Sequence, residues 1–183
     1  ATVRCCTQNG VRGGSATVHF PIWHQEIEDI LVLKNNKGTE DNRVRKLDYS
    51  IQISKLFYER FIKDEDITLF SPHEVPGLYE AFGMPEFDEM YEKYERKTSI
   101  DKKKVRAQTL FMDLLKERAE TGRIYIMNID HCNTHSSFKD KVYMSNLCQE
   151  ITLPTKPVQH IDDDEGEIAL CILSAINLGL IKD

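Results

Sequence analysis

Hydrophobic positions along this chain recur either at every second residue, as in strands, or at every third or fourth residue, as in helices. The changes between these two periods mark the expected elements. Short runs rich in β-branched and aromatic residues predict strands, which span residues 15–21, 47–53, 66–70 and 123–129. Apolar residues spaced three or four positions apart predict helices, which span residues 22–33, 54–63, 77–96 and 98–119. This alternation of strands and helices predicts an α/β fold with buried strands.

Local signals refine the ends of these elements. Thr98 and Asp101 have the spacing of a capping box, and they predict the start of the 98–119 helix. Gly122 is expected close to the end of that helix. On the 54–63 helix, Leu56, Phe57, Phe61 and Ile62 are expected to face inward, and Trp23 is expected to anchor the core.

A second polar pattern lies near the C-terminal end of the chain. Residues 145–154 read as an extended strand, which would place Asn146, Cys148 and Glu150 on one face, opposite Leu147, Gln149 and Ile151. Burying such a polar row is costly unless something occupies it, so a small polar ligand is one interpretation. The alternative is an edge strand with a solvated polar face and an inert cysteine.

Residues 160–167 are expected to form an acidic turn before an apolar strand over 168–176.

Composition limits the functions that this sequence can have. The chain has 183 residues, of which 40% are hydrophobic and 30% charged, enough for one globular domain or part of a larger one. Its net charge of −6 argues against a nucleic-acid surface, and no apolar run is long enough to span a membrane. Five cysteines without the spacing of a secreted scaffold predict a reducing, cytoplasmic setting. Because the chain begins ATVRCC, we expect it to start partway through a longer protein.

Two further patterns resemble metal sites. The string DHCNTH at 130–135 contains His131, Cys132 and His135, but it lacks the second ligand pair of a closed site, so we predict no metal there. It is expected to be a turn ordered by hydrogen bonds. The acidic run 162–165 lacks the loop spacing of an EF-hand and is expected to be a solvated hairpin.

Several strings resemble one family, in order along the chain. SNLCQEITLPTKP at 145–157, GEIALC at 166–171 and LSAINLG at 173–179 resemble the finger-loop region of the class I ribonucleotide reductase large subunit. CTQNGVRGG at 6–14 resembles the specificity loop of that family, with Asn9 where glycine is expected. LVLKNN at 31–36 and DITLFSP at 66–72 resemble the segments that follow this loop in the same family. Long strings in register are more specific than one short motif.

The resemblance implies a fold and an enzyme class. It implies that residues 1–183 are part of a catalytic α/β barrel of ten strands with a central finger loop. The chain would then be a central fragment of a ribonucleoside-diphosphate reductase large subunit, inactive by itself.

The resemblance also implies residue roles. Cys148 would carry a thiyl radical, Glu150 would act as general base, and Asn146 would hold the substrate hydroxyls. Cys171 would be half of the reducing pair, although a buried core thiol is the alternative. The implied substrate-binding residues are Asn146, Leu147, Cys148, Gln149 and Glu150. The implied specificity-loop residues are Thr7, Gln8, Asn9, Gly10, Arg12 and Gly13; without the resemblance, this loop reads as a glycine-rich surface turn.

Partners follow from the same resemblance. They are a ribonucleoside diphosphate substrate, nucleoside triphosphate effectors, the remaining portion of the large subunit and a small subunit that generates the radical with its metal. Thioredoxin or glutaredoxin would supply reducing equivalents, and the chain itself would bind no cofactor directly. Two alternatives remain: a non-catalytic interaction module with structural cysteines, and a thiol hydrolase that pairs Cys148 with His131 or His135.

Overall fold

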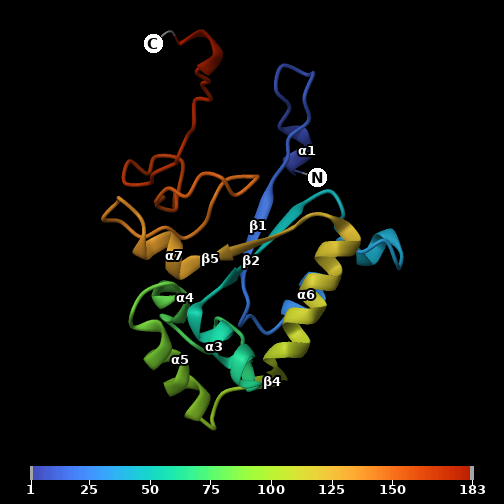
Figure 1. Ribbon diagram of the computed structural model, residues 1–183, viewed down its shortest axis with the longest axis vertical. Helices are drawn as coiled ribbons and strands as arrows, with labels where there is room; N and C mark the ends of the chain where they lie inside the picture. Colours follow the sequence, from blue (N-terminus) through green and yellow to red (C-terminus); the bar gives the residue numbers. More distant parts are fainter. Residues whose placement is uncertain (1, 182–183) are drawn as a thin grey trace.

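The computed structural model describes residues 2–181, and it has the mixed α/β architecture that the alternating periods predicted. In chain order, the elements are α1 (Thr2–Cys5), β1 (Thr17–Pro21), α2 (Ile27–Leu31), η1 (Glu40–Asn42), β2 (Asp48–Ile53), α3 (Lys55–Lys63), β3 (Asp66–Phe70), α4 (Leu78–Ala81), α5 (Phe87–Arg96), β4 (Lys102–Arg106), α6 (Ala107–Thr121), β5 (Ile124–Asn128), α7 (Ile129–Thr134) and η2 (Leu178–Leu180). Figure 1 shows α6 on one side of the central strands and the chain that follows α7 on the other.

The central sheet has the order β1-β2-β5, with all neighbours parallel. Strand β2 alternates between apolar and polar residues, and Tyr49, Ile51 and Ile53 share its apolar face. That face packs against α2, α3 and α6 through one hydrophobic core. The core includes Ile27, Ile30, Phe57, Leu110, Leu114 and Ile124. Burial of these side chains is the main force that holds the helices on the sheet.

The opposite face of the sheet carries polar side chains that are buried or half-buried. Ser50 and Gln52 are 0% and 1% exposed. The strand register places Thr17 and His19 of β1 and Tyr125 of β5 on the same face. Buried polar side chains favour hydrogen-bond partners, and residues 143–149 provide partners to this face, while His19 Nδ1 and Gln52 Oε1 have none among the described residues. We call this surface the polar sheet face.

Strands β3 and β4 form a separate antiparallel pair. Phe70 of β3 is bonded to the chain that follows β1, because Gln25 N donates to Phe70 O (2.8 Å) and Phe70 N donates to Trp23 O (2.8 Å). Helices α4 and α5 cover this pair with a second core that contains Trp23, Phe70, Phe82, Phe87 and Tyr91. Trp23 is 1% exposed, which confirms its predicted role as a core anchor.

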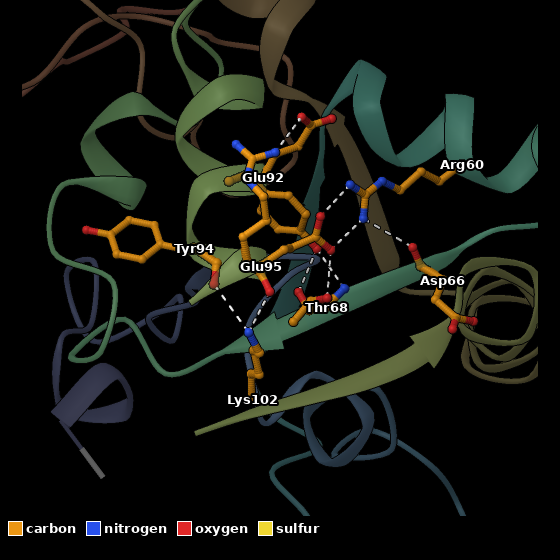
Figure 2. A network of polar contacts seen from close by, with 9 residues as sticks. Arg60, Asp66, Thr68, Glu92, Tyr94, Glu95 and Lys102 are labelled. Atoms are coloured by element: carbon orange, nitrogen blue, oxygen red, sulfur yellow. Dashed lines mark hydrogen bonds and ion pairs between the residues drawn. The ribbon is translucent and has the colours of Figure 1, made fainter. Parts of the chain in front are cut away.

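A polar network joins α3, α5 and β3 (Figure 2). Arg60 donates through both terminal nitrogens to the two carboxylate oxygens of Glu95, at 2.6 Å each. Thr68 Oγ1 donates to Glu95 Oε1 at 2.6 Å. The side chains of Arg60 and Glu95 are only 12% and 17% exposed. This bidentate pair therefore fastens helices α3 and α5 to strand β3 from a largely buried position.

Several predicted elements have different limits in the structure. The predicted capping box at 98–101 is wrong, because residues Lys102–Arg106 pair with β3 and helix α6 begins only at Ala107. The predicted 22–33 helix is reduced to α2, and the 77–96 helix is divided into α4 and α5. Ile62 was expected to face inward but is 78% exposed, because it lies on the outer side of α3. Gly122 ends α6 with a φ of 70°, as its position predicted.

The predicted strand at 168–176 is also wrong. Between residues 168 and 177 the structure has no regular element, and side chains such as Leu170 and Ile172 are 83% and 95% exposed. This segment extends away from the sheet in Figure 1 and has no neighbouring strand to pair with. Within residues 2–181 the strands form one three-stranded sheet and one two-stranded sheet, not a closed barrel.

Candidate active site

Residues 145–151 form a closed loop, which corrects the predicted strand at 145–154. The side chain of Asn146 accepts a hydrogen bond from Ile151 N (3.0 Å), and Asn146 N donates to Ile151 O (3.3 Å). Gln149 has a φ of 67°, which lies in the left-handed region and outside the β region of a regular strand. Asparagine favours such local bonds to the backbone, and here they form in place of the hydrogen bonds that a strand would make to a neighbouring strand. Asn146 therefore closes the base of the loop and Cys148 lies at its tip.

The loop rests on the polar sheet face. Thr17 Oγ1 donates to Leu147 O (2.6 Å), and the His19 ring nitrogen Nε2 lies 3.1 Å from Ser145 O. Gln52 Nε2 donates to Tyr143 O. Burial lowers the pKa of His19, although the bond to Ser145 acts in the opposite direction. Polar residues of β1 and β2 thus hold the backbone that leads to Cys148.

Gln149 completes this set of contacts from the loop side. Its Oε1 accepts from Ser50 Oγ (2.6 Å), and its Nε2 donates to Ile126 O (2.6 Å). The side chain is therefore directed onto the sheet, and Gln149 is not among the residues that line the adjacent pocket. Tyr125 lies beside the loop tip, and its pKa is raised, first by burial and then by the neighbouring thiol of Cys148.

A pocket of about 650 Å³ opens beside the loop and contains the predicted catalytic groups. Asn146, Cys148, Glu150 and Cys171 all line it, together with Arg12 from the other end of the chain. Apolar side chains such as Leu147 and Leu170 make up much of the remaining wall. The pocket combines a thiol, a carboxylate, an amide and a guanidinium, which suits a polar ligand that also has an apolar portion.

A hairpin returns Cys171 to this pocket. Lys156 and Glu167 exchange two backbone hydrogen bonds (3.2 and 3.0 Å), and their side chains form an ion pair at 3.6 Å. At the turn, Asp163 accepts bonds from the backbone nitrogens of Gln159, Glu165 and Gly166, which lower the pKa of its carboxyl. The acidic run at 162–165 is therefore a hairpin turn, as predicted. Cys171 is exposed, so the alternative of a buried core thiol is wrong.

The 6–14 loop approaches the same pocket. Gln8 N donates to Arg12 O (2.8 Å), and Asn9 and Gly10 between them have φ values of 52° and 69°. An Asn-Gly pair is typical of turns that require this left-handed backbone, so Asn9 accommodates the turn where glycine was expected. A Cβ at Gly14 would overlap the carbonyl oxygens of Val3 and Cys6. The turn thus presents Arg12 to the pocket from a tightly packed base.

The DHCNTH string has a structural role at the edge of the site. It forms most of α7 instead of the predicted turn, and Asn133 donates to Val142 O (3.1 Å) while accepting from Val142 N (2.8 Å). His131 and His135 are exposed, and the pocket that holds Cys148 has no histidine in its described lining. The contact that a Cys–His hydrolase needs is therefore not formed. Among residues 2–181, no three His, Cys, Asp or Glu side chains are grouped so as to hold a metal ion.

Polar positions inside strands carried a signal that sequence reasoning did not use. Ser50 and Gln52 alternate with apolar residues in β2, and this alternation by itself predicts only a strand. Their burial shows that both faces of β2 are covered. In the part of the chain that the structure describes, no helix has the length and apolar character needed to cross a membrane.

The sequence is similar to known proteins of one family. Residues 1–182 match the family model for the ribonucleotide reductase barrel domain. The chain is 60% identical to the ribonucleoside-diphosphate reductase subunit alpha of Haemophilus influenzae, over 99% of this chain and 25% of that protein. It is 58% identical to ribonucleoside-diphosphate reductase 1 subunit alpha of Escherichia coli, over 85% and 21%. It is 48% identical to the subunit alpha of Enterobacteria phage T4, over 96% and 24%. The chain thus spans about a quarter of the length of these curated relatives.

Proposed function

This chain belongs to the ribonucleotide reductase barrel-domain family, and from that premise we propose that it supplies the radical and reducing chemistry of a ribonucleoside-diphosphate reductase large subunit. One observation carries the proposal: Asn146, Cys148, Glu150 and Cys171, which come from two separate segments, line a single pocket. A non-catalytic interaction module has no need for these four groups to line one pocket.

The proposed reaction assigns one role to each group. As a thiyl radical, Cys148 takes the hydrogen atom from ribose C3′, so that an S–H bond forms and a C–H bond breaks. Glu150 accepts the proton of the 3′-hydroxyl, and Asn146 holds the ribose hydroxyls in line with the thiol. The 2′-hydroxyl leaves as water after it gains a proton. Cys171 and a second thiol are oxidised to a disulfide and supply two electrons and two protons, of which one proton leaves in the water and the other ends at C2′. Cys148 then returns its hydrogen atom to C3′, which restores the thiyl radical.

Further components belong to the same proposal. Leu147 and the backbone of the loop tip contact the substrate, while Thr7, Gln8, Asn9, Gly10, Arg12 and Gly13 transmit the identity of a nucleoside triphosphate effector. A small metal-containing subunit supplies the radical, and thioredoxin or glutaredoxin restores the thiols in the cytoplasm. The remaining portion of the large subunit completes a ten-stranded barrel around the loop. Among the residues that the structure describes, no strand pairs with the outer edge of β1 or of β5. This supports the proposal, because open parallel edges are otherwise an association hazard.

Glu150→Gln tests the role of the general base. We expect kcat for deoxynucleotide formation in the assembled large subunit to fall by about a hundredfold, because the amide cannot accept the 3′-hydroxyl proton. Glu167→Gln is the matched control, since Glu167 lines the same pocket but pairs with Lys156. It should retain activity within about threefold. Equal losses in both variants would mean that pocket charge, not proton transfer, is what Glu150 contributes.

The 183-residue chain by itself is expected to form no deoxynucleotide, even with a radical-generating small subunit present. Of the cysteines that the structure describes, only Cys148 and Cys171 line the pocket, so the reducing step lacks a second thiol. Product analysis by chromatography, with a complete large subunit as positive control, makes the test. Measurable turnover by the chain alone would show that the chemistry needs fewer groups than we propose.

A further inference from the structure

Gln149 has a backbone and a side chain that both need explanation. Its φ of 67° lies in the left-handed region that residues with a Cβ seldom adopt. Its amide spans two strands, since Oε1 accepts from Ser50 Oγ of β2 and Nε2 donates to Ile126 O of β5 (2.6 Å each). An uncommon backbone conformation at a loop tip persists only where the surroundings fix it.

We propose that Gln149 is a positioning residue that fixes the loop tip on the sheet and so sets where the Cys148 thiol stands in the pocket. This inference rests on the proposed function, because positioning matters only if the thiol reacts. It assigns to the Gln149 side chain a structural task on the polar sheet face, in place of contact with substrate.

The anchors on the two sides of Cys148 support the inference. On one side, Thr17 Oγ1 of β1 donates to Leu147 O (2.6 Å). On the other side, Gln149 reaches β2 and β5. Cys148 thus lies between two consecutive anchors that together engage all three strands of the sheet. Rotation of the tip would break at least one of these bonds, so the thiol has a fixed place although its side chain is exposed.

Burial makes the Ser50–Gln149 bond specific. Ser50 is 0% exposed, so water cannot readily replace its partner. Because the Ser50 hydroxyl donates to Oε1, the amide nitrogen is left to donate to Ile126 O, and both polar ends of the side chain are used. Leucine at position 149 would fill similar space, but it would take away the acceptor of the buried Ser50 hydroxyl and the side-chain donor to Ile126 O.

Hydrogen–deuterium exchange of the 183-residue chain tests directly whether Gln149 fixes the loop tip. In Gln149→Leu, the loop amides of Gln149 and Ile151 should exchange roughly tenfold faster, while amides of β2 change less than about twofold. Ser50→Ala should act in the same direction, and the double variant should add little to Gln149→Leu. Gln149→Gly separates the two features, because glycine accepts the backbone conformation but lacks the amide. The loop amides of Gln149→Gly should therefore also exchange faster than those of the wild type.

Gln108→Leu is the matched control, since Gln108 Nε2 also donates to a main-chain carbonyl, Phe61 O (3.3 Å), but on the helical side of the sheet. It should leave loop exchange unchanged. Wild-type protection in Gln149→Leu or in Gln149→Gly would overturn the proposal, and so would equal loosening by Gln108→Leu.

The reaction provides the second readout. In the assembled large subunit, Gln149→Leu should lower kcat roughly tenfold with KM changed less than about twofold, because a displaced thiol reacts poorly with a substrate that still binds. Normal kcat in a variant whose loop exchanges faster would overturn the positioning role. A wild-type subunit without reductase activity would instead contradict the proposed function. The exchange result would then still decide whether Gln149 fixes the loop tip.

Discussion

Replacement of Cys148 by alanine in the assembled large subunit is expected to reduce deoxynucleotide formation to below roughly a thousandth of the wild-type rate. Alanine has no sulfur to carry a radical, and no other described cysteine stands at the tip of the 145–151 loop. The pocket has a volume of about 650 Å³, so the loss of one sulfur atom leaves most of its binding surface intact. Chromatography of the products under saturating substrate measures the change.

Nucleotide binding should stay within about twofold of wild type in Cys148→Ala, because other groups in the pocket make the binding contacts. Cys5→Ala is the matched control, since Cys5 is also exposed but lies on α1 outside the pocket lining. It should retain nearly full turnover. Near-normal activity in Cys148→Ala would remove the role that we assign to this thiol.

Arg60→Ala is expected to have the largest effect on stability, a loss of about 3 kcal/mol in the free energy of unfolding. The substitution leaves the Glu95 carboxylate largely buried, with the Thr68 hydroxyl as its remaining side-chain partner. It also removes the bond from Arg60 to Asp66 O (3.2 Å) at the start of β3. Urea denaturation of the 183-residue chain measures the loss.

Arg96→Ala is the matched control, because Arg96 pairs with Glu92 on the same helix as Glu95 but at the surface. Those side chains are 70% and 49% exposed, and their closest charged atoms lie 3.6 Å apart. Exposed pairs contribute little, so we expect a loss below about 0.5 kcal/mol. Equal losses in the two arginine variants would contradict the importance given to the buried network in Figure 2.

The same pair predicts how stability depends on pH. Burial acts to raise the pKa of Glu95, but the bonds from Arg60 and Thr68 outweigh it and hold that pKa below its usual value. A lowered carboxyl pKa stabilises the fold above the pKa of the unfolded chain, and this contribution is lost as pH falls through the folded pKa. Arg60→Ala should therefore flatten the acid side of the stability profile. An unchanged profile would mean that other carboxyls dominate there.

Sequence predicted those elements whose hydrophobic pattern agrees with the side on which they are buried. The run 47–53 alternates and forms β2, and 123–129 contains β5, because each strand places one apolar face against helices. Strand β4 was missed because its sequence is KKKVR, which has almost no apolar alternation. It is a strand because its backbone pairs with β3, and no local signal carries that information.

The resemblance named the residues of the candidate site, but it did not give their geometry. Alternation at 145–154 predicted a strand, whereas the Asn146 side chain bonds to Ile151 N and turns the chain back. A periodic pattern cannot show such a competition between side chain and ladder. Cys171 lines the same pocket as Cys148 because of the hairpin at 156–167, and the approach of Arg12 depends on the whole fold. Ser50 and Gln149 are separated by 99 positions, so only coordinates could pair them.

Competition between unlabelled substrate and substrate deuterated at ribose C3′ tests most directly whether the loop-tip thiol takes that hydrogen. In the assembled large subunit, we expect deuteration to lower kcat/KM measurably, and the wild-type and Gln108→Leu proteins to show the same effect. Identical kcat/KM for the two substrates, together with undiminished turnover in Cys148→Ala, would contradict hydrogen abstraction by this thiol.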